Sequence, residues 1–344
     1  MDLSPGYSDY KLEVVFLKEV KKKSRNILLR NILLILLAFL ICSAIILIAL
    51  TYPKYHETMT EAEEQLLADS TILKTEYGDI EYAVEGERTP VLLLHGAGGG
   101  YDQGLWAGKV FFGDDYKFIS VSRYGYLRSP IPDNASIESQ AAAYKTLLDN
   151  LSIDKIIVVG VSAGGPSATQ FANDYPDRCS ALILISAVSM GPAPGDQDPF
   201  YVSIIHIIQQ SDYVYWLLTR FFQPVILDLM GIPTQVYETF NPEQKELVQE
   251  MLDIMHPMSQ RYKGTVNDEK MIEFYTVPTD NLGAPALIIH AKDDALVSYK
   301  HAENAHSKIN QSQLVLYNTG GHGMLSQMNG TRVLVKEFLN ESTY

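Results

Sequence analysis

The sequence predicts a doubly wound, mostly parallel α/β sheet with a helical cap insertion, preceded by one N-terminal transmembrane helix. Three observations predict this architecture. Short, fully apolar, β-branched runs alternate with helix-compatible stretches, which is typical of parallel strands buried on both faces. Residues 190–282 interrupt that alternation with helical, aromatic-rich segments that lack a buried-strand signature. Residues 32–50 form an uncharged run that is long enough to cross a bilayer.

The composition is that of a globular protein whose charge is unevenly spread along the chain. The chain has 344 residues and a net charge of −14. An acidic balance argues against nucleic-acid binding, which needs a basic face. Residues 1–30 hold seven Lys or Arg and four Asp or Glu, residues 31–50 hold none, and the rest therefore carries −17. A basic head, an apolar stretch and an acidic body describe a membrane anchor followed by a soluble domain.

The apolar run predicts a transmembrane helix at residues 31–52. At about 1.5 Å per residue, the 19 residues from Ile32 to Leu50 span about 28 Å as a helix, close to the roughly 30 Å of a hydrocarbon core. A cleaved signal peptide is the alternative, but its apolar region is shorter and a small-x-small site follows it. Here Leu50-Thr51-Tyr52-Pro53 follows, so the sequence favours an uncleaved anchor.

Charges on the two sides of the run predict its orientation. The basic residues in front of it are Lys18, Lys21, Lys22, Lys23, Arg25 and Arg30. Acidic residues predominate in residues 53–69, which we interpret as a polar helical stalk. The positive-inside rule places residues 1–30 in the cytoplasm and the body, residues 70–344, outside it. The predicted localisation is a single-pass membrane protein with an extracytoplasmic domain.

The globular pattern begins with two alternating segments, Thr71–Tyr77 and Ile80–Val84, around a turn at Gly78-Asp79. Buried strands are then expected at Val91–Leu94, Phe118–Val121, Ile156–Val159, Ala181–Ile185, Ala286–Ile289 and Leu314–Tyr317. Helices are expected at Ser136–Leu151, Pro166–Tyr175, Lys300–Ile309 and Val333–Leu339. Strands that alternate with helices in this way indicate a doubly wound sheet.

The insertion at residues 190–282 follows a strand, so it is expected to cover the carboxyl ends of the sheet. It opens on a loop, Gly191–Gly195. Its expected helices are Tyr201–Gln209, Tyr213–Leu229, Pro242–Met255 and Asn267–Tyr275. Its aromatic residues favour an apolar acyl or alkyl group in the substrate. The alternative is that these aromatic side chains form only the core of the cap.

A candidate nucleophile lies at Gly160-Val161-Ser162-Ala163-Gly164, between a predicted strand and a predicted helix. Strand, Gly-x-Ser-x-Gly and helix is the context of a nucleophile elbow, a sharp turn that exposes the Ser side chain. A bulky side chain at Gly160 or Gly164 would collide with neighbouring backbone. Because Gly and Ser are common in turns, the pattern needs support from other stretches.

A serine hydroxyl needs a base to take its proton and an acid to orient that base. His322 is the candidate base, because it follows the last strand and has glycines on both sides. Asp293 and Asp294 both follow the strand at Ala286–Ile289 and both are candidate acids. By the residues alone this choice stays open, since an Asp pair after a strand is commonly a cap or turn.

The other histidines have simpler structural interpretations. His290 ends a strand, where a packed, hydrogen-bonded residue is expected. His301 and His306 are assigned to a surface helix. The remaining ones lie in the stalk or the insertion: His56, His206 and His256, with His95 in a glycine-rich loop.

That loop, His95–Gly100, is the candidate for one half of an oxyanion hole. Two backbone N–H donors are needed, and Ala97 and Ala163 are expected to supply them. The alternative is a dinucleotide-binding loop, but a Gly-x-Gly-x-x-Gly pattern from Gly96 would need glycine where Tyr101 stands. The oxyanion interpretation is therefore favoured.

Together these four stretches resemble the α/β-hydrolase superfamily, over about residues 70–340. The order Ser162, Asp294, His322 is the order of that superfamily. The segment Ala291–Val297 is similar to its Gly-x-x-Asp-x-x-Val pattern, with Ala291 in place of Gly, and the resemblance selects Asp294 as the acid. Ser122–Ser129 is similar to the Asp-x-x-Gly-x-Gly-x-Ser segment and departs from it at Ser122 and Leu127.

The resemblance implies a membrane-anchored serine hydrolase that works through an acyl-enzyme, with a carboxylic ester of an apolar group as substrate. Two alternatives stay open: an amidase or peptidase of the same fold, and a ligand-binding receptor or scaffold that retains the triad. Epoxide hydrolases and haloalkane dehalogenases of this fold use Asp at the elbow, so Ser162 argues against them. No cofactor and no metal are expected, since no His, Asp or Glu set has ligand spacing. The expected partners are a small ester or lipid-like substrate and the membrane, through residues 32–50, and no nucleic acid.

Overall fold

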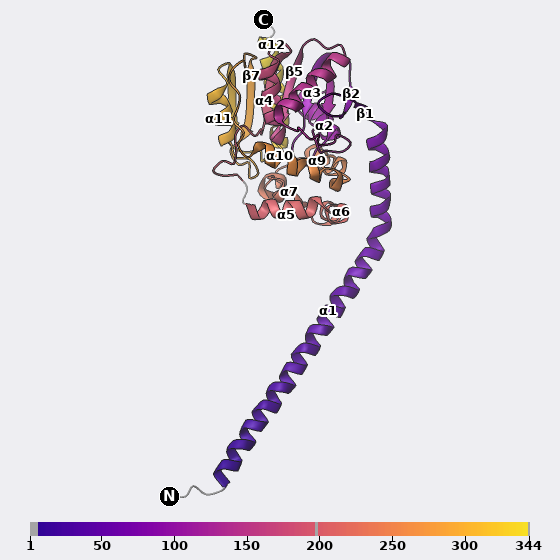
Figure 1. The fold of residues 1–344 in the computed structure, drawn as a ribbon, viewed down its shortest axis with the longest axis vertical. Helices are drawn as coiled ribbons and strands as arrows, with labels where there is room; N and C mark the ends of the chain where they lie inside the picture. Colours follow the sequence, from indigo (N-terminus) through magenta and orange to yellow (C-terminus); the bar gives the residue numbers. More distant parts are fainter. Residues whose placement is uncertain (1–5, 197–198, 343–344) are drawn as a thin grey trace. The chain divides into compact units, whose positions relative to one another are not determined.

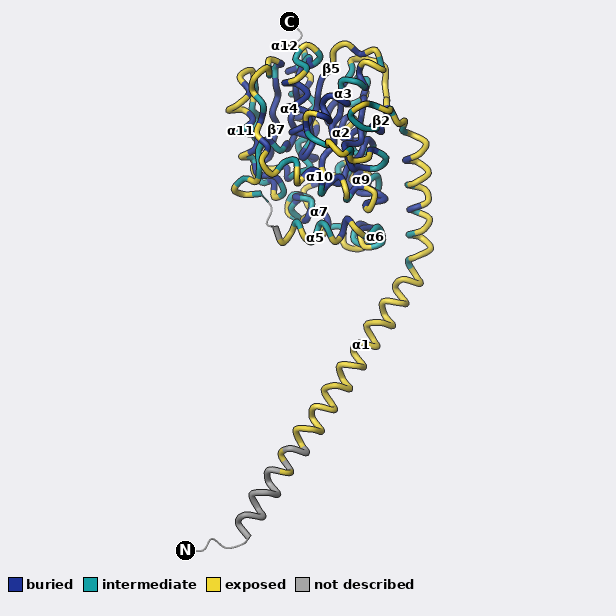
Figure 2. Tube along the Cα trace, in the orientation of Figure 1, coloured by how far each residue is buried: buried dark blue, intermediate teal, exposed yellow. Residues whose placement is uncertain are grey.

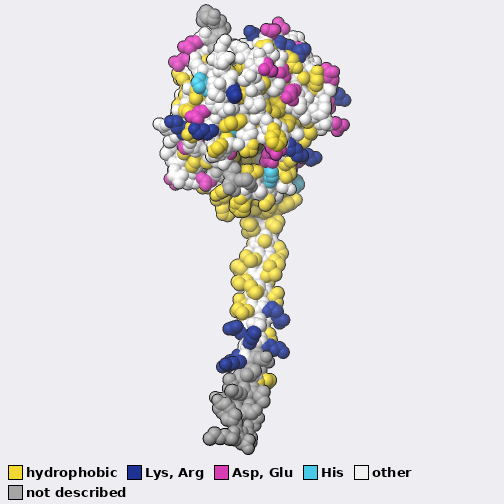
Figure 3. Space-filling model, turned by 60° about the vertical axis from the view of Figure 1, so that its left-hand side comes forward, with side chains coloured by type: hydrophobic (Ala, Val, Ile, Leu, Met, Phe, Trp, Pro, Cys, Tyr) yellow, Lys and Arg dark blue, Asp and Glu magenta, His cyan; other side chains and the backbone are white. Residues whose placement is uncertain are grey.

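The computed structural model describes residues 6–196 and 199–342 and divides the chain into two compact units, Met1–Thr58 and Met59–Tyr344. The first unit consists of most of one long helix, α1, at Gly6–Ala68. Its segment Lys21–Ala68 is long and apolar enough to cross a membrane by length and composition, and its most apolar window is entirely exposed (Figure 2). Figure 3 shows the hydrophobic side chains of this helix as a band that ends at a cluster of Lys and Arg.

Within the described residues, the second unit is built on an eight-stranded sheet with the order β1-β2-β4-β3-β5-β6-β7-β8 (Figure 1). The strands are β1 Thr71–Leu73, β2 Ile80–Glu85, β3 Thr89–Leu94, β4 Tyr116–Val121, β5 Ile156–Val161, β6 Cys179–Ile185, β7 Ala286–Ala291 and β8 Ser312–Tyr317. β1 and β2 are antiparallel, and β4, β3, β5, β6, β7 and β8 pair in parallel. The mostly parallel sheet that the sequence predicts is confirmed.

Helices cover both faces of the sheet. Neighbouring residues of β3 show why: Leu93 belongs to one hydrophobic cluster, while Leu92 and Leu94 belong to the other. Successive side chains of a strand point to opposite faces, so an apolar run buries both. The helices around the sheet are α2 Tyr101–Phe112, α3 Ile137–Asn150, α4 Gly165–Asp174, α11 Lys300–Lys308 and α12 Met328–Ser342. The first cluster contains residues of α2 and α12, and the second contains residues of α3, α4 and α11.

Two of these elements differ from the expectation. The strand expected at Thr71–Tyr77 ends at Leu73, because Thr75 and Gly78 form a turn. The Gly78 N–H donates to the Thr75 carbonyl, and the Thr75 hydroxyl donates to the Gly78 carbonyl. Helix α2 was not expected, since its sequence carries glycines at Gly104 and Gly108 that are poor helix formers. A Cβ at Gly104 would collide with the Ser120 hydroxyl, so these glycines let the helix pack closely on β4.

The insertion at residues 190–282 is helical in its described part, as expected. Its helices are α5 Pro199–Gln209, α6 Asp212–Phe221, α7 Gln223–Leu229, α8 Thr234–Glu238, α9 Pro242–Ile254 and α10 Tyr262–Ile272. The single helix expected at Tyr213–Leu229 is broken at Phe222, because Pro224 has no N–H to donate to the carbonyl four residues before it and is tolerated only in the first turn of a helix, here the first turn of α7. α10 also begins earlier than the expected Asn267. Figure 1 shows α5, α6 and α7 together at one end of the second unit.

Candidate active site

The nucleophile elbow lies between β5 and α4. Ser162 follows β5 directly and has a φ of 51°, in the left-handed region that non-glycine residues seldom occupy. A Cβ at Gly160 would lie 2.7 Å from the Cβ of Ala168, and one at Gly164 would collide with the Leu94 carbonyl. The two glycines therefore allow the close packing that holds Ser162 in its strained turn, as their positions in the sequence indicated.

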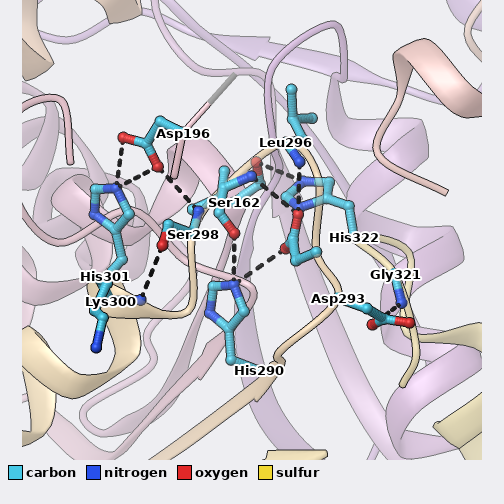
Figure 4. Close-up of polar contacts among 12 residues, drawn as sticks. Ser162, Asp196, His290, Asp293, Leu296, Ser298, Lys300, His301, Gly321 and His322 are labelled. Atoms are coloured by element: carbon cyan, nitrogen blue, oxygen red, sulfur yellow. Dashed lines mark hydrogen bonds and ion pairs between the residues drawn. The ribbon is translucent and has the colours of Figure 1, made fainter. Parts of the chain in front are cut away.

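Ser162, His322 and Asp294 are in contact in the structure. His322 Nε2 lies 2.9 Å from Ser162 Oγ, and His322 Nδ1 lies 2.8 Å from Asp294 Oδ2 (Figure 4). Since an ionised carboxylate only accepts, Nδ1 carries the proton and Nε2 is left to accept from the serine hydroxyl. The three side chains come from loops at the carboxyl ends of β5, β8 and β7, which parallel pairing brings to one edge of the sheet.

Four donors surround the carboxylate of Asp294. Its Oδ1 accepts the backbone N–H groups of Leu296 and Val297, both at 2.9 Å. Its Oδ2 faces His322 and also His290, whose Nε2 is 3.1 Å away. Burial by itself would raise the pKa of Asp294, but the two histidines outweigh it and hold that pKa well below its usual range. Asp294 is therefore an ionised acceptor placed beneath His322.

Asp293 has a different contact. Its Oδ1 accepts the backbone N–H of Gly321 at 2.9 Å, and Gly321 has a φ of 58° (Figure 4). The side chain thus ties the loop that carries His322 to the loop after β7. Of the two acids that the residues alone left open, Asp294 is the one that contacts the imidazole.

Two histidines have roles that the sequence did not reveal. His290 is fully buried on β7 and donates from Nε2 to the Val297 carbonyl at 2.9 Å, beside Asp294. Its contact with the candidate acid was not foreseen, although it stands four residues before that acid. His301 lies, as expected, on a helix with an exposed side, α11, but its own side chain is buried and its Nε2 lies 3.1 Å from the Asp196 carboxylate (Figure 4).

The glycine-rich loop after β3 lies against the nucleophile. A Cβ at Gly96 would be 3.0 Å from the Ser162 Cβ, so a larger residue here would press on the nucleophile. Ala97 lines the same cavity as Ser162, and Ala163 follows Ser162 in the 3-10 turn Ser162–Gly164. Ala97 therefore lies in the cavity wall that contains Ser162, and Ala163 is the next residue of the elbow, while the assignment of the oxyanion hole to these two residues stays a prediction.

His95 and Arg123 hold this loop in position. His95 Nε2 accepts the Arg123 N–H at 3.0 Å, so Nδ1 carries the proton and donates to the Gly96 carbonyl at 2.6 Å. Burial and the charge of Arg123 lower the pKa of His95 well below its usual value, so the ring is neutral. Gly96 in turn donates its N–H to Gln103 Oε1 at 3.1 Å.

A buried ion pair connects the loop to the cap. Arg123 donates to the His95 carbonyl and forms two hydrogen bonds of 2.6 Å with Asp268 of α10. Burial would lower the pKa of Arg123, but the Asp268 carboxylate outweighs it and raises that pKa, so the pair is ionised. Ser122 stands where the superfamily pattern has Asp. Its hydroxyl donates to Glu81 Oε2 at 2.9 Å, so a carboxylate from β2 lies beside this position. Neither pairing has a local signal in the sequence.

Ser162 and His322 line a cavity of about 220 Å³ between the sheet and the cap. Most of its wall is apolar, and the larger side chains include Trp106, Phe111, Ile226, Leu229, Met251 and Met255. The polar residues of the cap in this wall are His206, Gln209, Thr265 and Glu269. The lining contains no Lys or Arg among the described residues. Within the same part of the chain, no group of three His, Cys, Asp or Glu side chains is arranged to hold a metal ion.

The alpha/beta hydrolase fold family model matches residues 89–327, which is more than half of the chain. The chain therefore belongs to the α/β-hydrolase family, and the architecture implied by the resemblance is confirmed.

Curated relatives of the chain are hydrolases. The uncharacterized hydrolase YcgS of Bacillus subtilis is 26% identical over 260 residues, which cover 71% of this chain and 88% of that protein. The 2-hydroxy-6-oxononadienedioate/2-hydroxy-6-oxononatrienedioate hydrolase 1 of Dechloromonas aromatica is 27% identical over 285 residues, which cover 77% of this chain and 91% of that protein. These relatives agree with a hydrolase of the α/β fold.

Solved structures support the fold. An alpha/beta hydrolase fold protein from Nakamurella multipartita superposes with a TM-score of 0.66 at 22% identity, over 79% of this chain and 99% of that one. An esterase from Exiguobacterium antarcticum superposes with a TM-score of 0.57 at 21% identity, over 78% of this chain and 98% of that one.

Proposed function

We propose that this hydrolase is a membrane-anchored serine esterase that cleaves carboxylic esters of apolar acyl groups through an acyl-enzyme. The observation that carries the proposal is the continuous contact from Ser162 through His322 to Asp294, at the wall of a largely apolar cavity. A hydroxyl in contact with an imidazole nitrogen, which a buried carboxylate orients, is the arrangement that activates serine.

In the first half of the reaction, Ser162 Oγ attacks the acyl carbon and His322 Nε2 takes the hydroxyl proton. The carbonyl oxygen becomes an oxyanion, and we assign its stabilisation to the backbone N–H groups of Ala97 and Ala163. When the tetrahedral intermediate collapses, the bond to the alcohol oxygen breaks, and His322 returns the proton to that leaving oxygen. Ser162 is left as an ester of the acyl group.

In the second half, a water molecule takes the place of the alcohol. His322 accepts one proton from this water as its oxygen attacks the acyl carbon of the Ser162 ester. Collapse of the second intermediate breaks the bond to Ser162 Oγ, and the proton passes from His322 to that oxygen. Asp294 stabilises the imidazolium in both halves without itself becoming protonated.

The cavity wall favours an uncharged acyl group. The relatives from Dechloromonas aromatica and other bacteria are named for dioates, which carry two carboxylates. Within the part of the chain that the structure describes, the lining includes no Lys or Arg to pair with a carboxylate, and it does include Glu269. A carboxylate without a cation is costly to bury, whereas a methylene chain gains free energy on leaving water. An ester of an apolar acid is therefore the better match for this cavity.

The anchor belongs to the same proposal. Residues 32–50 are uncharged and lie in the exposed apolar part of α1, behind a basic segment. We assign this segment to one crossing of the bilayer, with the N-terminus in the cytoplasm and the catalytic domain outside. Protease protection in sealed vesicles measures the orientation, and a domain that is shielded on the cytoplasmic side would contradict it.

The test of the activity uses the full chain in detergent with p-nitrophenyl esters of increasing acyl length and a matched series of anilides. We expect labelling of Ser162 by a fluorophosphonate probe, and ester hydrolysis that increases from acetyl to longer acyl groups. Faster cleavage of the anilides would indicate an amidase. Absence of both labelling and turnover would favour a receptor or scaffold. Turnover of a 2-hydroxy-6-oxo-dienedioate above that of any ester would favour the reaction for which the relatives are named.

A further inference from the structure

Helix α5 is apolar on two opposite sides. Val202, Ile205 and Ile208 line the cavity. On the other side Phe200 and Ile207 are 69% and 65% exposed. A helix that is hydrophobic all round is normally found inside a protein core or in a membrane, because either environment removes both sides from water. In α5 the inner side meets the cavity, and the outer side is left at the surface of the domain.

The neighbouring cap helices extend this apolar surface. The side chains in question, which we call the outer cap face, are Phe200, Tyr201, Ile207, Val214, Phe221, Phe222 and Val225. They are seven of the thirteen large hydrophobic side chains that are exposed in the described part of the second unit. Figure 3 shows hydrophobic side chains gathered at the end of the domain that carries α5 to α7. Apolar side chains that cluster at a protein surface are typical of interaction sites.

The outer cap face carries little free charge. Between residues 199 and 229 the charged side chains are Asp212, Arg220 and Asp228. Asp212 accepts two hydrogen bonds from Ser259, and Arg220 pairs with Asp253 at 2.8 Å. Asp228 accepts the N–H of Thr234. Because these charges have partners within the cap, the surface suits an uncharged apolar medium rather than a charged protein or an anionic headgroup layer.

The cavity reaches the surface beside this face. His206 and Glu269 both line the cavity, are both partly exposed, and bond to each other at 2.7 Å between α5 and α10. His206 immediately precedes Ile207, a member of the outer cap face. A molecule that enters the cavity at this pair therefore passes beside Ile207 of the outer cap face.

The proposed anchor would keep the outer cap face close to an apolar medium, the bilayer. Residues 51–58 separate the apolar run from Met59, where the second unit begins. As a helix these residues extend about 12 Å. If residues 32–50 cross a bilayer, the domain is confined next to that bilayer at a high effective concentration, so that even a weak affinity of the outer cap face leads to contact.

We propose that the outer cap face lies in the surface of the bilayer that anchors the chain, and that the substrate is an acyl ester resident in that bilayer. This inference rests on the anchor and the esterase activity proposed above. The face inserts its aromatic and aliphatic side chains among zwitterionic lipids, as interfacial helices do. The ester then moves from the bilayer past His206 and Glu269 to Ser162 without crossing water.

The first test measures insertion in the full chain, reconstituted into phosphatidylcholine vesicles. Ile207→Cys is labelled with an environment-sensitive fluorophore in a Cys42→Ser background; Cys179 is buried, and burial raises the pKa of its thiol to about 12, so it stays unlabelled. Val333→Cys on α12, 56% exposed, is the matched control. We expect blue-shifted emission and quenching by spin-labelled lipid at residue 207 and neither at residue 333. Equal quenching at both positions, or none at 207, would overturn the proposal.

The same sample distinguishes a lipid partner from a second copy of the chain. A blue shift at residue 207 that grows with the number of chains per vesicle, without lipid quenching, would assign the outer cap face to a dimer and overturn the inference.

The second test separates docking from catalysis. Ile207→Ser combined with Phe222→Ser removes two exposed apolar side chains that do not line the cavity. We expect hydrolysis of a monoacyl ester carried in the vesicles to fall roughly tenfold or more, with hydrolysis of a soluble butyrate ester unchanged. Val333→Ser should alter neither rate. Unchanged hydrolysis of the vesicle-borne ester would overturn the proposal. If the parent chain hydrolyses neither ester, the proposed activity fails, and lipid quenching at residue 207 still decides whether the face docks.

Discussion

The two walls of the cavity differ in how their side chains are held. On the sheet side, the polar side chains of Ser162, His322 and Asp294 are held by polar contacts. Asp294 accepts from two backbone N–H groups and faces two histidines. His322 bridges Ser162 and Asp294. On the cap side the wall consists mainly of aliphatic and aromatic side chains in van der Waals contact. Among the described residues, the buried Oε1 of Gln209 in this wall has no hydrogen-bond partner.

This difference assigns different tasks to the two walls. Hydrogen bonds fix angles and protonation states, which proton transfer and oxyanion stabilisation require. Apolar contacts are non-directional and scale with area, so they discriminate the length and shape of a ligand but not its orientation. The sheet side is therefore expected to determine whether bonds are broken, and the cap side which acyl group is accepted.

The largest effect is expected at the nucleophile and its base. Ser162→Ala or His322→Ala should lower kcat by about 10⁶, as in a subtilisin triad, and the double variant should be no worse, because the groups act as one unit. Steady-state ester hydrolysis by the full chain is the measurement, with thermal unfolding as the control for folding. Substantial hydrolysis by Ser162→Ala would refute the mechanism.

The two neighbouring acids offer a matched pair. Asp294→Asn should lower kcat by about 10⁴, because an amide in this position favours the wrong tautomer of His322. Asp293→Asn should cost far less, since its contact is a single hydrogen bond to the Gly321 backbone that an amide oxygen can also accept. Parallel kcat measurements compare them. A larger loss from Asp293→Asn would reverse the assignment of the acid.

His290 tests how far the polar network extends behind the triad candidate. His290→Phe removes the Nε2 donor beside Asp294 and should lower kcat about tenfold to a hundredfold, which is the worth of a hydrogen bond to a charged group. His290→Gln keeps a donor nitrogen near the same position and should restore most of the rate with KM unchanged. If both variants lose equally, His290 only fills space and does not position Asp294.

On the cap side the expected effect is smaller and concerns selectivity. Met255 lines the cavity, and Met255→Trp should shorten the acyl chain that fits. Since each buried methylene is worth about 0.8 kcal/mol, kcat/KM should fall roughly fourfold for each methylene that is displaced, with acetyl esters unaffected. Ile207→Ser on the outer side of α5 is the control and should leave the preference of soluble esters unaltered. An equal fall for all chain lengths would show that Met255 supports the catalytic loops.

The smallest effect is expected in the pH dependence of stability. The pKa of Asp294 is lower in the folded chain than the value of about 3.9 in an unfolded one, so the unfolded state binds more protons as the pH falls through 4. Asp294 thus contributes stability that is present above about pH 4 and is lost towards lower pH. Unfolding midpoints between pH 3 and pH 6 should decline less steeply in Asp294→Asn than in Asp293→Asn. Identical slopes would indicate that the folded state does not depress this pKa.

Local patterns in the sequence predict several features of this protein correctly. The strand, turn and helix around Ser162 are contiguous, and the apolar runs of β3, β5, β6 and β7 indicate burial on both faces. The composition and the spacing of apolar residues likewise indicate the strand-free insertion and the apolar part of α1. For these features the fold class is confirmed by the structure, with errors where glycines obscure a helix, as in α2, where a proline divides one, as between α6 and α7, and at the ends of elements, as in β1 and α10.

Which side chains contact one another could not be predicted from local patterns and is known from the folded structure. Asp293 and Asp294 are neighbours in the chain, and the choice between them depends on a contact with His322, 28 residues away. The links of Arg123 to Asp268 and of His301 to Asp196 span more than one hundred residues each. The two sides of α5 are equally apolar in sequence, and the fold alone determines that one lines the cavity while the other faces outward. Such contacts form when segments far apart in the sequence pack together in the sheet and the cap. The spacing of apolar residues within one segment carries no information about them.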